Sequence, residues 1–377
     1  MRVLHVYRTY FPDTQGGLEE AIRQICRATS RLGVENRVFT LSQRPDPPTV
    51  SMPEAEVVRV SRSFEIASCG FSTLAGASSF ARLARAHDLI HYHLPWPFAD
   101  MLHLGLRIDR PAVATYQSDV VRQRLLGLLY RPLQQRFLAS LQALVATSPD
   151  YVRTSAVLAP LAERIDIIPN TIDPASYPTA DVVASEVWSQ RFGTPFFLFI
   201  GVLRYYKGLD YLIEAASQVR HAIAVAGEGP EGERLRRKAA STGARNVHFL
   251  GHVSDADKVA LIRACRAIAF PSHLRSEAFG MTLLEGAMLG RALISCDIGT
   301  GTSYVNLHGQ TGLVVPPCDS NALAEAINRL GANTDEADRM GRAARCRFDE
   351  VFSSNAVGQS YLRLYRRVLG QLAAGGT

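Results

Sequence analysis

Several features that mark other classes of protein are missing from this 377-residue sequence. No apolar run approaches the roughly 18 uninterrupted residues that a membrane-spanning helix needs, so we expect no transmembrane segment. The stretch Met1–Tyr7 is too short and too interrupted for a signal peptide and indicates a buried strand. No two of the six cysteines have the spacing of metal ligands. A chain of this size is not expected to need a disulfide framework, which favours a reducing, cytoplasmic location.

The excess of one charge sign is also small. The sequence has 41 Lys and Arg against 35 Asp and Glu, a net charge of +6. This balance favours anionic partners such as nucleotides, phosphorylated lipids or an anionic membrane surface. It does not indicate nucleic acid, because no recognised nucleic-acid-binding motif accompanies it.

What is present is a regular alternation of short apolar runs and helix-length amphipathic segments. This pattern predicts an α/β fold in which helices cover both faces of parallel sheets. The expected strands fall into two series: 3–7, 37–41, 89–93, 112–116, 143–147 and 165–168, followed by 196–201, 222–226, 247–250, 267–270, 292–295 and 312–315.

A proline-rich stretch, residues 169–178, separates the two series and predicts a hinge. We therefore divide the chain into domains at 1–175 and 176–353, each long enough to form a core. Residues 354–377 begin with apolar side chains at helical spacing, and we expect this helix to pack back on the first domain. Ligands of such sheets bind beyond the carboxyl ends of the strands.

Gly16 and Gly17 follow the first strand and precede a predicted helix, residues 18–32. Glycine lets the backbone approach a ligand closely, and a helix N-terminus presents unpaired amides to an anion. The pair therefore favours a phosphate-binding loop. A plain tight turn is the alternative.

The segment Gly201–Gly208 follows the first strand of the second series and contains two cations, Arg204 and Lys207. A leaving diphosphate develops negative charge, which Arg stabilises by forked hydrogen bonds and Lys as a point charge. A solvated loop is the alternative.

Residues 276–286 place Glu277 before a predicted helix and Glu285 inside it. Two carboxylates can hold the vicinal hydroxyls of a sugar and of a ribose. The amides at the helix start would face the anionic part of the same ligand. A capping glutamate beside an ordinary surface glutamate is the alternative.

Three further patterns carry less information. The loop 298–303 is rich in glycine and hydroxyl groups and suits phosphate or sugar oxygens, or is simply flexible. His91 and His93 share one strand face, and His93 is a candidate substrate contact. We expect no metal there, because no third ligand is apparent. Residues 227–232 match G-x-G-x-x-G, but the strand 247–251 lacks the acidic residue of a dinucleotide site, so we do not expect NAD.

With Glu277 and Glu285 flanking Phe279-Gly280, and with Arg204 and Lys207 ahead of them, the sequence resembles glycosyltransferase family 4 over essentially its whole length. The resemblance implies retaining enzymes of the GT-B architecture, in which two Rossmann-like domains face a central cleft that takes a nucleotide-sugar. The stretches 116–123 and 272–280 further resemble bacterial mannosyl- and D-rhamnosyltransferases of O-antigen assembly. This implies a GDP-linked donor and a place in lipopolysaccharide biosynthesis.

The resemblance also implies roles at matching positions. The catalytic residues implied are Arg204, Lys207 and Glu277. The donor-binding residues implied are Gly16, Gly17, Phe279, Gly280, Met281, Thr282 and Glu285, the last of these at the ribose. The acceptor or sugar contacts implied are His93, Gln117 and Asp119.

Two positions depart from the family pattern. Val202 stands where the family often has arginine, and Arg204, with the same side-chain direction in an extended chain, is the expected substitute. Gln117 stands where the family often has histidine, and glutamine takes up no proton at pH 7. The alternatives are therefore a transferase that uses a UDP- or ADP-sugar, a GT-B sugar-nucleotide 2-epimerase and a non-catalytic nucleotide-sugar-binding protein.

Retention without an obvious nucleophile suggests front-face attack assisted by the leaving phosphate, whose charge Arg204 and Lys207 balance. We expect no metal and no other cofactor. The segment 120–141 combines Arg122, Arg124, Arg131 and Arg136 with many leucines. Such a surface can dock on anionic lipid, although a solvated helix face has the same composition. We expect a lipid-pyrophosphate-linked saccharide as acceptor and peripheral association with the inner face of the cytoplasmic membrane.

Overall fold

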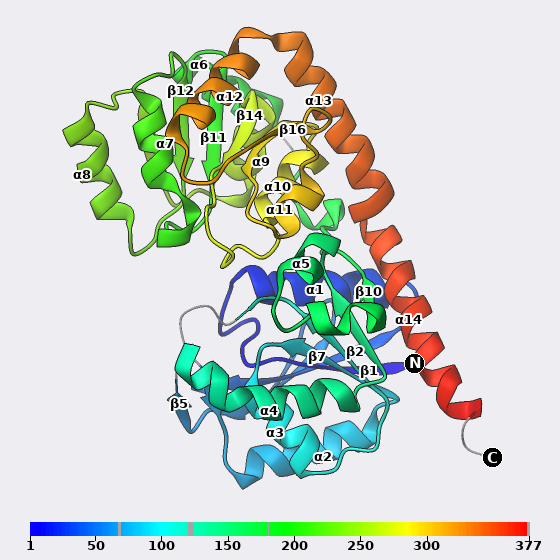
Figure 1. Ribbon diagram of the computed structural model, residues 1–377. Coiled ribbons are helices and arrows are strands. Elements are labelled where there is room, and N and C mark those ends of the chain that lie inside the picture. Colours follow the sequence, from blue (N-terminus) through cyan, green and yellow to red (C-terminus); the bar gives the residue numbers. More distant parts are fainter. Residues whose placement is uncertain (67–68, 120–123, 180, 375–377) are drawn as a thin grey trace. The chain divides into compact units, whose positions relative to one another are not determined.

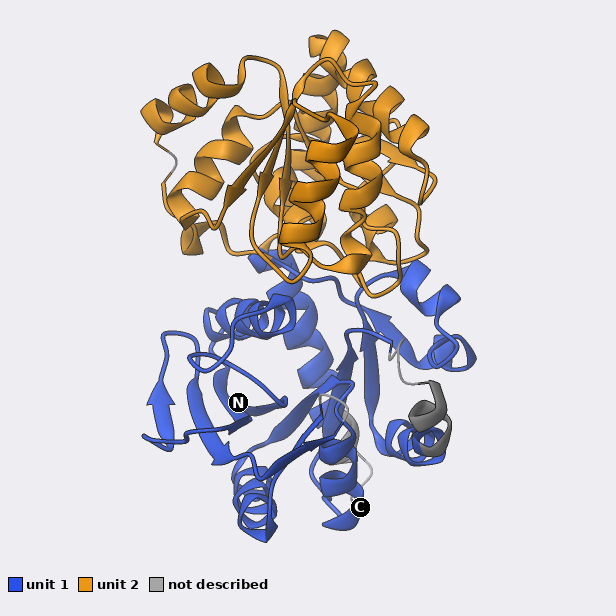
Figure 2. Cartoon of the chain, turned by 90° about the vertical axis from the view of Figure 1, so that its left-hand side faces the viewer, with its two compact units in different colours: residues 1–171, 354–377 blue, residues 172–353 orange. Residues whose placement is uncertain are grey.

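The computed structural model describes residues 1–66, 69–119, 124–179 and 181–374. The chain forms two compact units, unit 1 (residues 1–171 and 354–377) and unit 2 (residues 172–353), each with its own sheet (Figures 1 and 2). Every strand predicted above is present, and the predicted α/β class with largely parallel sheets is confirmed. Within the described part of the chain, none of the helices combines the length and hydrophobicity of a bilayer-spanning segment.

Unit 1 is built on an eight-stranded sheet in the order β10-β9-β8-β7-β1-β2-β4-β3, in which only β3 is antiparallel to its neighbour. Its strands are β1 (Arg2–Val6), β2 (Glu35–Ser42), β3 (Thr49–Ser51), β4 (Glu56–Ser61), β7 (Leu89–Leu94), β8 (Ala112–Tyr116), β9 (Ala143–Ala146) and β10 (Ile165–Ile167). A separate antiparallel hairpin joins β5 (Phe64–Ile66) to β6 (Cys69–Phe71). The sequence did not predict β3, β4, β5 or β6.

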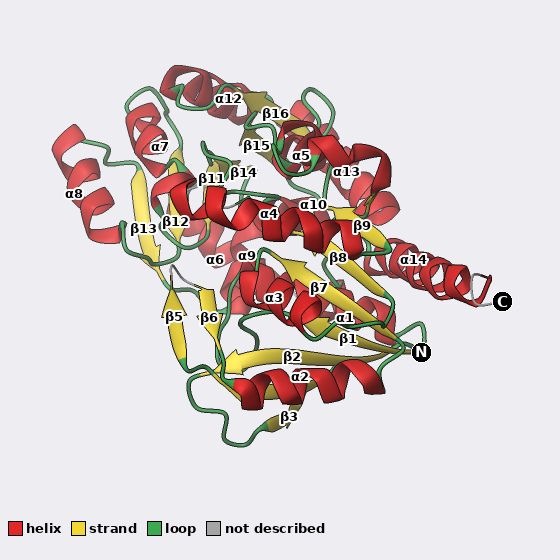
Figure 3. Ribbon diagram, turned by 60° about the horizontal axis from the view of Figure 1, so that its bottom comes forward, coloured by secondary structure: helices red, strands yellow, loops and turns green. Residues whose placement is uncertain are grey.

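Helices cover both faces of this sheet (Figure 3). They are α1 (Gly17–Ser30), α2 (Leu74–Ala86), α3 (Pro97–Gly105), α4 (Arg124–Ser140), α5 (Pro149–Thr154) and α14 (Ser354–Ala374). On one face, Ile25 of α1 and Tyr361 of α14 belong to the same buried cluster. On the other face, the Tyr92 ring meets Phe80 of α2 and Phe137 of α4.

The C-terminal helix α14 packs on α1 within unit 1. Its apolar stripe is buried: Val357, Tyr361, Leu364, Tyr365 and Val368. Gly358 permits a close crossing, because a Cβ there would lie 2.8 Å from the Ala28 carbonyl oxygen. The division at 171/172 precedes the predicted 175/176, because Ile172 already belongs to the core of unit 2 and forms a parallel bridge with Ser353.

Unit 2 contains a fully parallel six-stranded sheet in the order β13-β12-β11-β14-β15-β16. The strands are β11 (Phe196–Ile200), β12 (Ala222–Ala226), β13 (Val247–Gly251), β14 (Ala267–Phe270), β15 (Ala292–Cys296) and β16 (Gly312–Val315). The helices are α6 (Val182–Phe192), α7 (Leu209–Ala216), α8 (Gly232–Thr242), α9 (Asp255–Ala264), α10 (Met281–Met288), α11 (Gly301–Val305), α12 (Ser320–Ala332) and α13 (Thr334–Arg347).

The central strand β11 is apolar at every position because both of its faces are covered. Phe197 points toward a core that it shares with Leu212 of α7 and Ile327 of α12. The next residue, Leu198, points the opposite way, into a core with Leu284 of α10. The carboxyl ends of β11 and β14 are thereby held on a rigid base, and both predicted site motifs of this unit follow them.

Candidate active site

Two glycines shape the loop that follows β11. Gly201 (φ 149°) ends the strand, and Gly208 (φ 70°) directly precedes α7. A Cβ at position 208 would lie 1.9 Å from the carbonyl oxygen of Pro271, so only glycine permits this approach. The short helical turn Tyr205–Lys207 is thereby fixed against the loop that follows β14.

Lys207 and Glu277, predicted from separate motifs, form an ion pair. Lys207 Nζ lies 2.5 Å from Glu277 Oε2, and the Ser272 hydroxyl donates to the same oxygen at 3.3 Å. The two charged side chains are only 12% and 11% exposed. The ammonium also lies 4.8 Å from the centre of the Phe270 ring. Arg204 is exposed and makes no ion pair with any described residue, so its guanidinium is available to a ligand.

The start of α10 lies next to this pair in the chain. Gly280 (φ 91°) precedes the helix, whose first amides have no acceptor within it and can donate to an anion. Thr282 has a structural bond, because its hydroxyl donates to the Ile200 carbonyl oxygen at 3.2 Å. The Phe279 ring is buried against Phe352, so only its backbone can contribute to a site.

Glu285, in the same helix, is held by two residues that the sequence did not predict. Lys258 Nζ of α9 lies 3.0 Å from Glu285 Oε1, and the Tyr177 hydroxyl donates to the same oxygen at 2.7 Å. Burial lowers the pKa of Lys258, but the carboxylates of Glu285 and Asp255 outweigh burial and hold it above its ordinary value. Both partners lie far from Glu285 in sequence, so no local pattern indicates them.

The G-x-G-x-x-G segment, residues 227–232, supports the loop that carries the cations. A Cβ at Gly227 would lie 2.1 Å from the Gly201 carbonyl oxygen, and one at Gly229 would lie 2.6 Å from the Leu203 amide nitrogen. Backbone hydrogen bonds of 2.9 and 3.1 Å tie Leu203 to this segment in both directions. The glycines are therefore explained by backbone packing alone, without a dinucleotide.

The hydroxyl-rich loop 298–303 uses its side chains internally. Thr302 donates to the Cys296 carbonyl oxygen at 3.3 Å, and Ser303 donates to a carboxylate oxygen of Asp297 at 3.1 Å. Arg275 bridges this loop to the one after β14 through the Gly299 carbonyl oxygen, at 3.0 Å. These hydroxyls brace the site loops.

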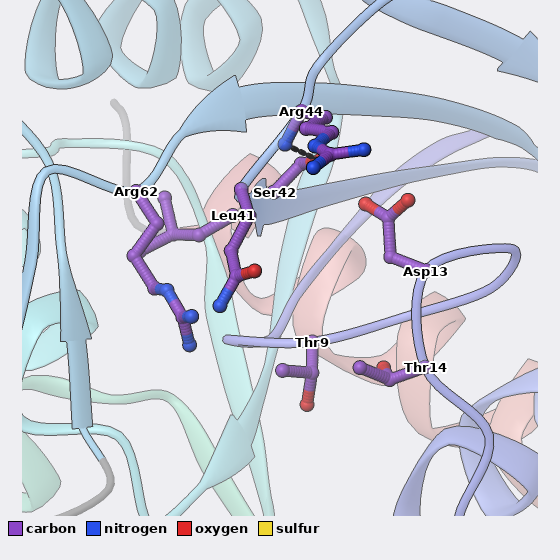
Figure 4. A pocket seen from close by; sticks show the side chains of 8 residues that line it. Thr9, Asp13, Thr14, Leu41, Ser42, Arg44 and Arg62 are labelled. Atoms are coloured by element: carbon purple, nitrogen blue, oxygen red, sulfur yellow. Dashed lines mark hydrogen bonds between the residues drawn. The ribbon is translucent and has the colours of Figure 1, made fainter.

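In unit 1, the loop after β1 borders a cavity of about 390 Å³ (Figure 4). Its lining is polar and partly cationic: Thr9, Asp13, Thr14, Leu41, Ser42, Gln43, Arg44 and Arg62. Asp13 is fixed by two hydrogen bonds from Arg59, at 2.5 and 3.1 Å. The same guanidinium bonds the carbonyl oxygens of Arg44 and Pro47, so the walls of the cavity are braced to each other.

Neither glycine of the predicted phosphate loop is required by the packing of unit 1. Gly17 is the first residue of α1, and a Cβ there would meet nothing within 4 Å. A Cβ at Gly16 would meet only the end of the Glu19 side chain. The absence of side chains here leaves the backbone open to close approach from outside the unit.

The three predicted acceptor or sugar contacts differ in position. His93 has no exposed surface, and its Nδ1 is buried without a partner among the described residues. Gln117 is 4% exposed, and the same holds for its Nε2. A ligand would reach either residue only if the packing around it opened. Asp119 accepts hydrogen bonds from Tyr116 at 3.1 Å and Ser155 at 2.7 Å, which brace its loop.

A third histidine joins His91 and His93, contrary to expectation. His5 on β1 is in register with His91, and ring nitrogens of the three lie within 4.8 Å of one another. His5 Nδ1 is 3.1 Å from His93 Nε2, and His91 Nδ1 is 2.8 Å from the Tyr365 hydroxyl of α14. Burial lowers the pKa of His5 to about 4. These contacts form a neutral hydrogen-bond network that links α14 to the sheet.

An Asp-x-Asp sequence at 255–257 has a structural use at the start of α9. The Ser254 hydroxyl accepts from the Asp257 amide at 3.0 Å and caps the helix. Asp255 pairs with Lys258 at 3.1 Å. Both carboxylates belong to the first helical turn, where negative charge is favourable.

The predicted basic segment coincides largely with α4. Arg131 and Arg136 are exposed on this helix. Arg122 lies outside the described residues, and Arg124 is the first residue of α4.

Comparisons with known proteins agree with this arrangement. Residues 15–176 match the model of Glycosyltransferase Family 4, and residues 185–347 match that of glycosyl transferases group 1. The chain is 46% identical over 354 residues to the D-rhamnosyltransferase WbpZ of Pseudomonas aeruginosa, covering 94% of this chain and 93% of the relative. It is 44% identical over 369 residues to the O-antigen chain mannosyltransferase C of Escherichia coli, covering 98% and 99%.

Solved structures show the same fold at lower identity. Sucrose-phosphate synthase from Thermosynechococcus elongatus aligns with a TM-score of 0.78 at 20% identity, covering 98% of this chain and 99% of the other. Anabaena HepE in complex with UDP and glucose aligns with a TM-score of 0.75 at 18% identity, covering 97% and 99%.

Proposed function

Because this chain belongs to glycosyltransferase family 4 and is a hexosyltransferase of the GT-B fold, we propose that it transfers mannose or D-rhamnose from a GDP-linked donor to a lipid-linked glycan in O-antigen assembly. The proposed sugars and pathway are those in the names of two relatives that match nearly the whole chain. The observation that carries the chemistry is the Lys207–Glu277 pair beside the free amides of α10.

The donor site proposed in unit 2 uses both charges of that pair. An ammonium has three donors, so Lys207 can keep Glu277 and still bind a phosphate oxygen. Glu277 Oε2 is occupied by Lys207 and Ser272, which leaves Oε1 for a sugar hydroxyl. The amides of Gly280 and Met281 face the diphosphate, and Glu285 takes the ribose hydroxyls.

In the proposed reaction, the acceptor oxygen bonds to the anomeric carbon on the face from which the nucleoside diphosphate departs. The bond between that carbon and the phosphate oxygen breaks, and its electron pair stays on the phosphate. The acceptor proton moves to this same oxygen, so configuration is retained without a protein nucleophile. Arg204, Lys207 and the α10 amides balance the leaving charge. We expect full activity in EDTA, and strict metal dependence would contradict this scheme.

We assign the acceptor to unit 1. The cavity beside the β1 loop offers hydroxyl, amide and guanidinium groups suited to a saccharide with an anionic carrier. Gly17 supports donor contact at the same loop, because unit 1 itself has no packing reason for glycine there. Exposed Arg131 and Arg136 support peripheral binding to an anionic membrane surface on the cytoplasmic side. Co-sedimentation with anionic vesicles that depends on neither lipid charge nor salt would refute the membrane proposal.

The first test is a thermal-shift panel with GDP, UDP, ADP and NAD. A ligand at 100 times its Kd adds about 2.7 kcal/mol to the free energy of unfolding. Stabilisation by GDP alone supports the GDP-sugar proposal. Stabilisation by UDP or ADP keeps the enzyme class but contradicts the donor, and stabilisation by NAD alone contradicts the donor site.

Turnover decides between catalysis and binding. GDP-mannose and GDP-D-rhamnose are incubated with a lipid-pyrophosphate saccharide, and GDP release and glycan extension are measured together. We expect both products to form in step. Tight donor binding with no turnover of either sugar would favour the non-catalytic nucleotide-sugar-binding protein that Gln117 leaves open.

A further inference from the structure

The two oxygens of the Glu285 carboxylate have different surroundings. Oε1 receives both the Tyr177 hydroxyl, at 2.7 Å, and the Lys258 ammonium, at 3.0 Å. Oε2 has no hydrogen-bond or ionic partner among the described residues, although the side chain as a whole is only 10% exposed. The carboxylate is thus anchored at one oxygen and available at the other.

The two anchoring groups come from different parts of unit 2. Tyr177 lies in the segment between the short helical turn Pro174–Ser176 and α6, and Lys258 lies in α9. The Lys258 ammonium also sits 4.8 Å from the centre of the Tyr177 ring. Each anchor therefore constrains the other as well as Glu285, and the three groups form a compact clamp.

We propose that Tyr177 and Lys258 are positioning residues that fix Glu285 Oε1, so that Oε2 accepts hydrogen bonds from the ribose hydroxyls of the donor nucleotide. The inference rests on the proposed donor-binding role of Glu285. A carboxylate accepting from a diol gains most when its rotamer is already fixed, because the entropy of ordering the side chain has been lost before binding. Lys258 also keeps the carboxylate charged, and charged acceptors form the stronger hydrogen bonds.

A merely structural salt bridge would behave differently. Lys238, in the same unit, also contacts two carboxylates, Asp210 at 3.0 Å and Glu214 at 2.6 Å. Its side chain is 24% exposed against 19% for Lys258. Lys238→Met is therefore a matched control that removes a lysine with two acidic partners away from Glu285.

The test compares a ribonucleotide with its 2′,3′-dideoxy analogue. The probe is GDP or UDP, whichever stabilises the wild type in the thermal-shift panel, and Kd is measured by calorimetry for both forms. Wild type, Tyr177→Phe, Lys258→Met and Lys238→Met are used as full-length chains with matched circular dichroism spectra. The readout is the ratio of the two Kd values, which a general loss of stability does not change.

We expect the wild type and Lys238→Met to prefer the ribonucleotide by about 10- to 100-fold, the range of one hydrogen bond to a charged group. Tyr177→Phe and Lys258→Met should each reduce this preference several-fold. An unchanged ratio in both variants, even with both Kd values raised equally, overturns the positioning role while leaving Glu285 at the ribose. No preference in the wild type overturns the ribose role of Glu285 and the inference together.

Discussion

Replacing Lys207 with methionine removes its charge and keeps an unbranched apolar stem beside Phe270. The variant leaves the Glu277 carboxylate, 11% exposed, with Ser272 as its remaining donor. Removing one partner of a buried ion pair costs about 3–5 kcal/mol. Because this pair is not fully buried, we expect a loss of about 2–3 kcal/mol in the stability of unit 2. In a unit of this size, that loss lowers Tm on the order of 5–10 °C.

The double variant Lys207→Met/Glu277→Gln separates stability from catalysis. It removes both charges, so no carboxylate is left without its cation, and most of the lost stability should return. Activity should not return, because the fixed cation for the leaving phosphate is still absent. We expect kcat to fall about 10²- to 10³-fold in both the single and the double variant.

The assay must report on unit 2 alone. The chain has two tryptophans, Trp96 in unit 1 and Trp188 in unit 2, so 5-fluorotryptophan labelling gives one ¹⁹F resonance for each unit. Thermal unfolding followed at the Trp188 resonance gives the stability of unit 2, and GDP release gives kcat. Wild-type turnover in Lys207→Met would remove this lysine from the site. A double variant less stable than the single one would refute the ion-pair reasoning.

Three further predictions concern other parts of the chain. The pKa of His5 is 6.5 in its ordinary state and about 4 when folded, so the unfolded chain binds a proton that the native one does not; stability at the Trp96 resonance should be complete above pH 6.5 and fall by about 3 kcal/mol toward pH 4, whereas a flat profile would contradict the buried network. Gly17→Val should change the stability of unit 1 by less than about 1 kcal/mol, because nothing lies within 4 Å, yet raise the KM for the donor; an unchanged KM would remove this loop from the site. Gly229→Ala places a Cβ 2.6 Å from the Leu203 amide nitrogen and should destabilise unit 2 by about 1–3 kcal/mol in urea unfolding, and a neutral result would show that the supporting segment yields.

The sequence was most informative where function requires a local pattern. Glu277 and Lys207 were each predicted from a motif that follows a strand, and the parallel sheet places the ends of β11 and β14 side by side. Their contact is therefore a consequence of topology that the motifs alone imply. Fold class followed from the apolar periodicity, which is strong when both faces of a sheet are buried.

Contacts made across the sheet were not predictable in the same way. His5 joins His91 only through the parallel register of β1 and β7, which the His-x-His spacing does not contain. Tyr177 and Lys258 reach Glu285 from distant segments with no motif of their own. The strand β4 was missed because it follows a proline-rich stretch, and its buried Arg59 breaks the apolar pattern while pairing with Asp13.

The position of α14 at the end of the chain sets the order in which the two units can be completed during synthesis. Unit 2 is continuous from residue 172 to 353, whereas unit 1 lacks a helix until residues 354–374 have been translated. At about 5–20 residues per second, the ribosome needs on the order of 10–40 s to pass from the end of the first segment to the end of α14. Throughout that interval the face that will receive Tyr361 and Tyr365 is uncovered in the nascent chain. The second unit to be translated is therefore the first that can finish folding, and the first must be protected from aggregation until the last helix emerges.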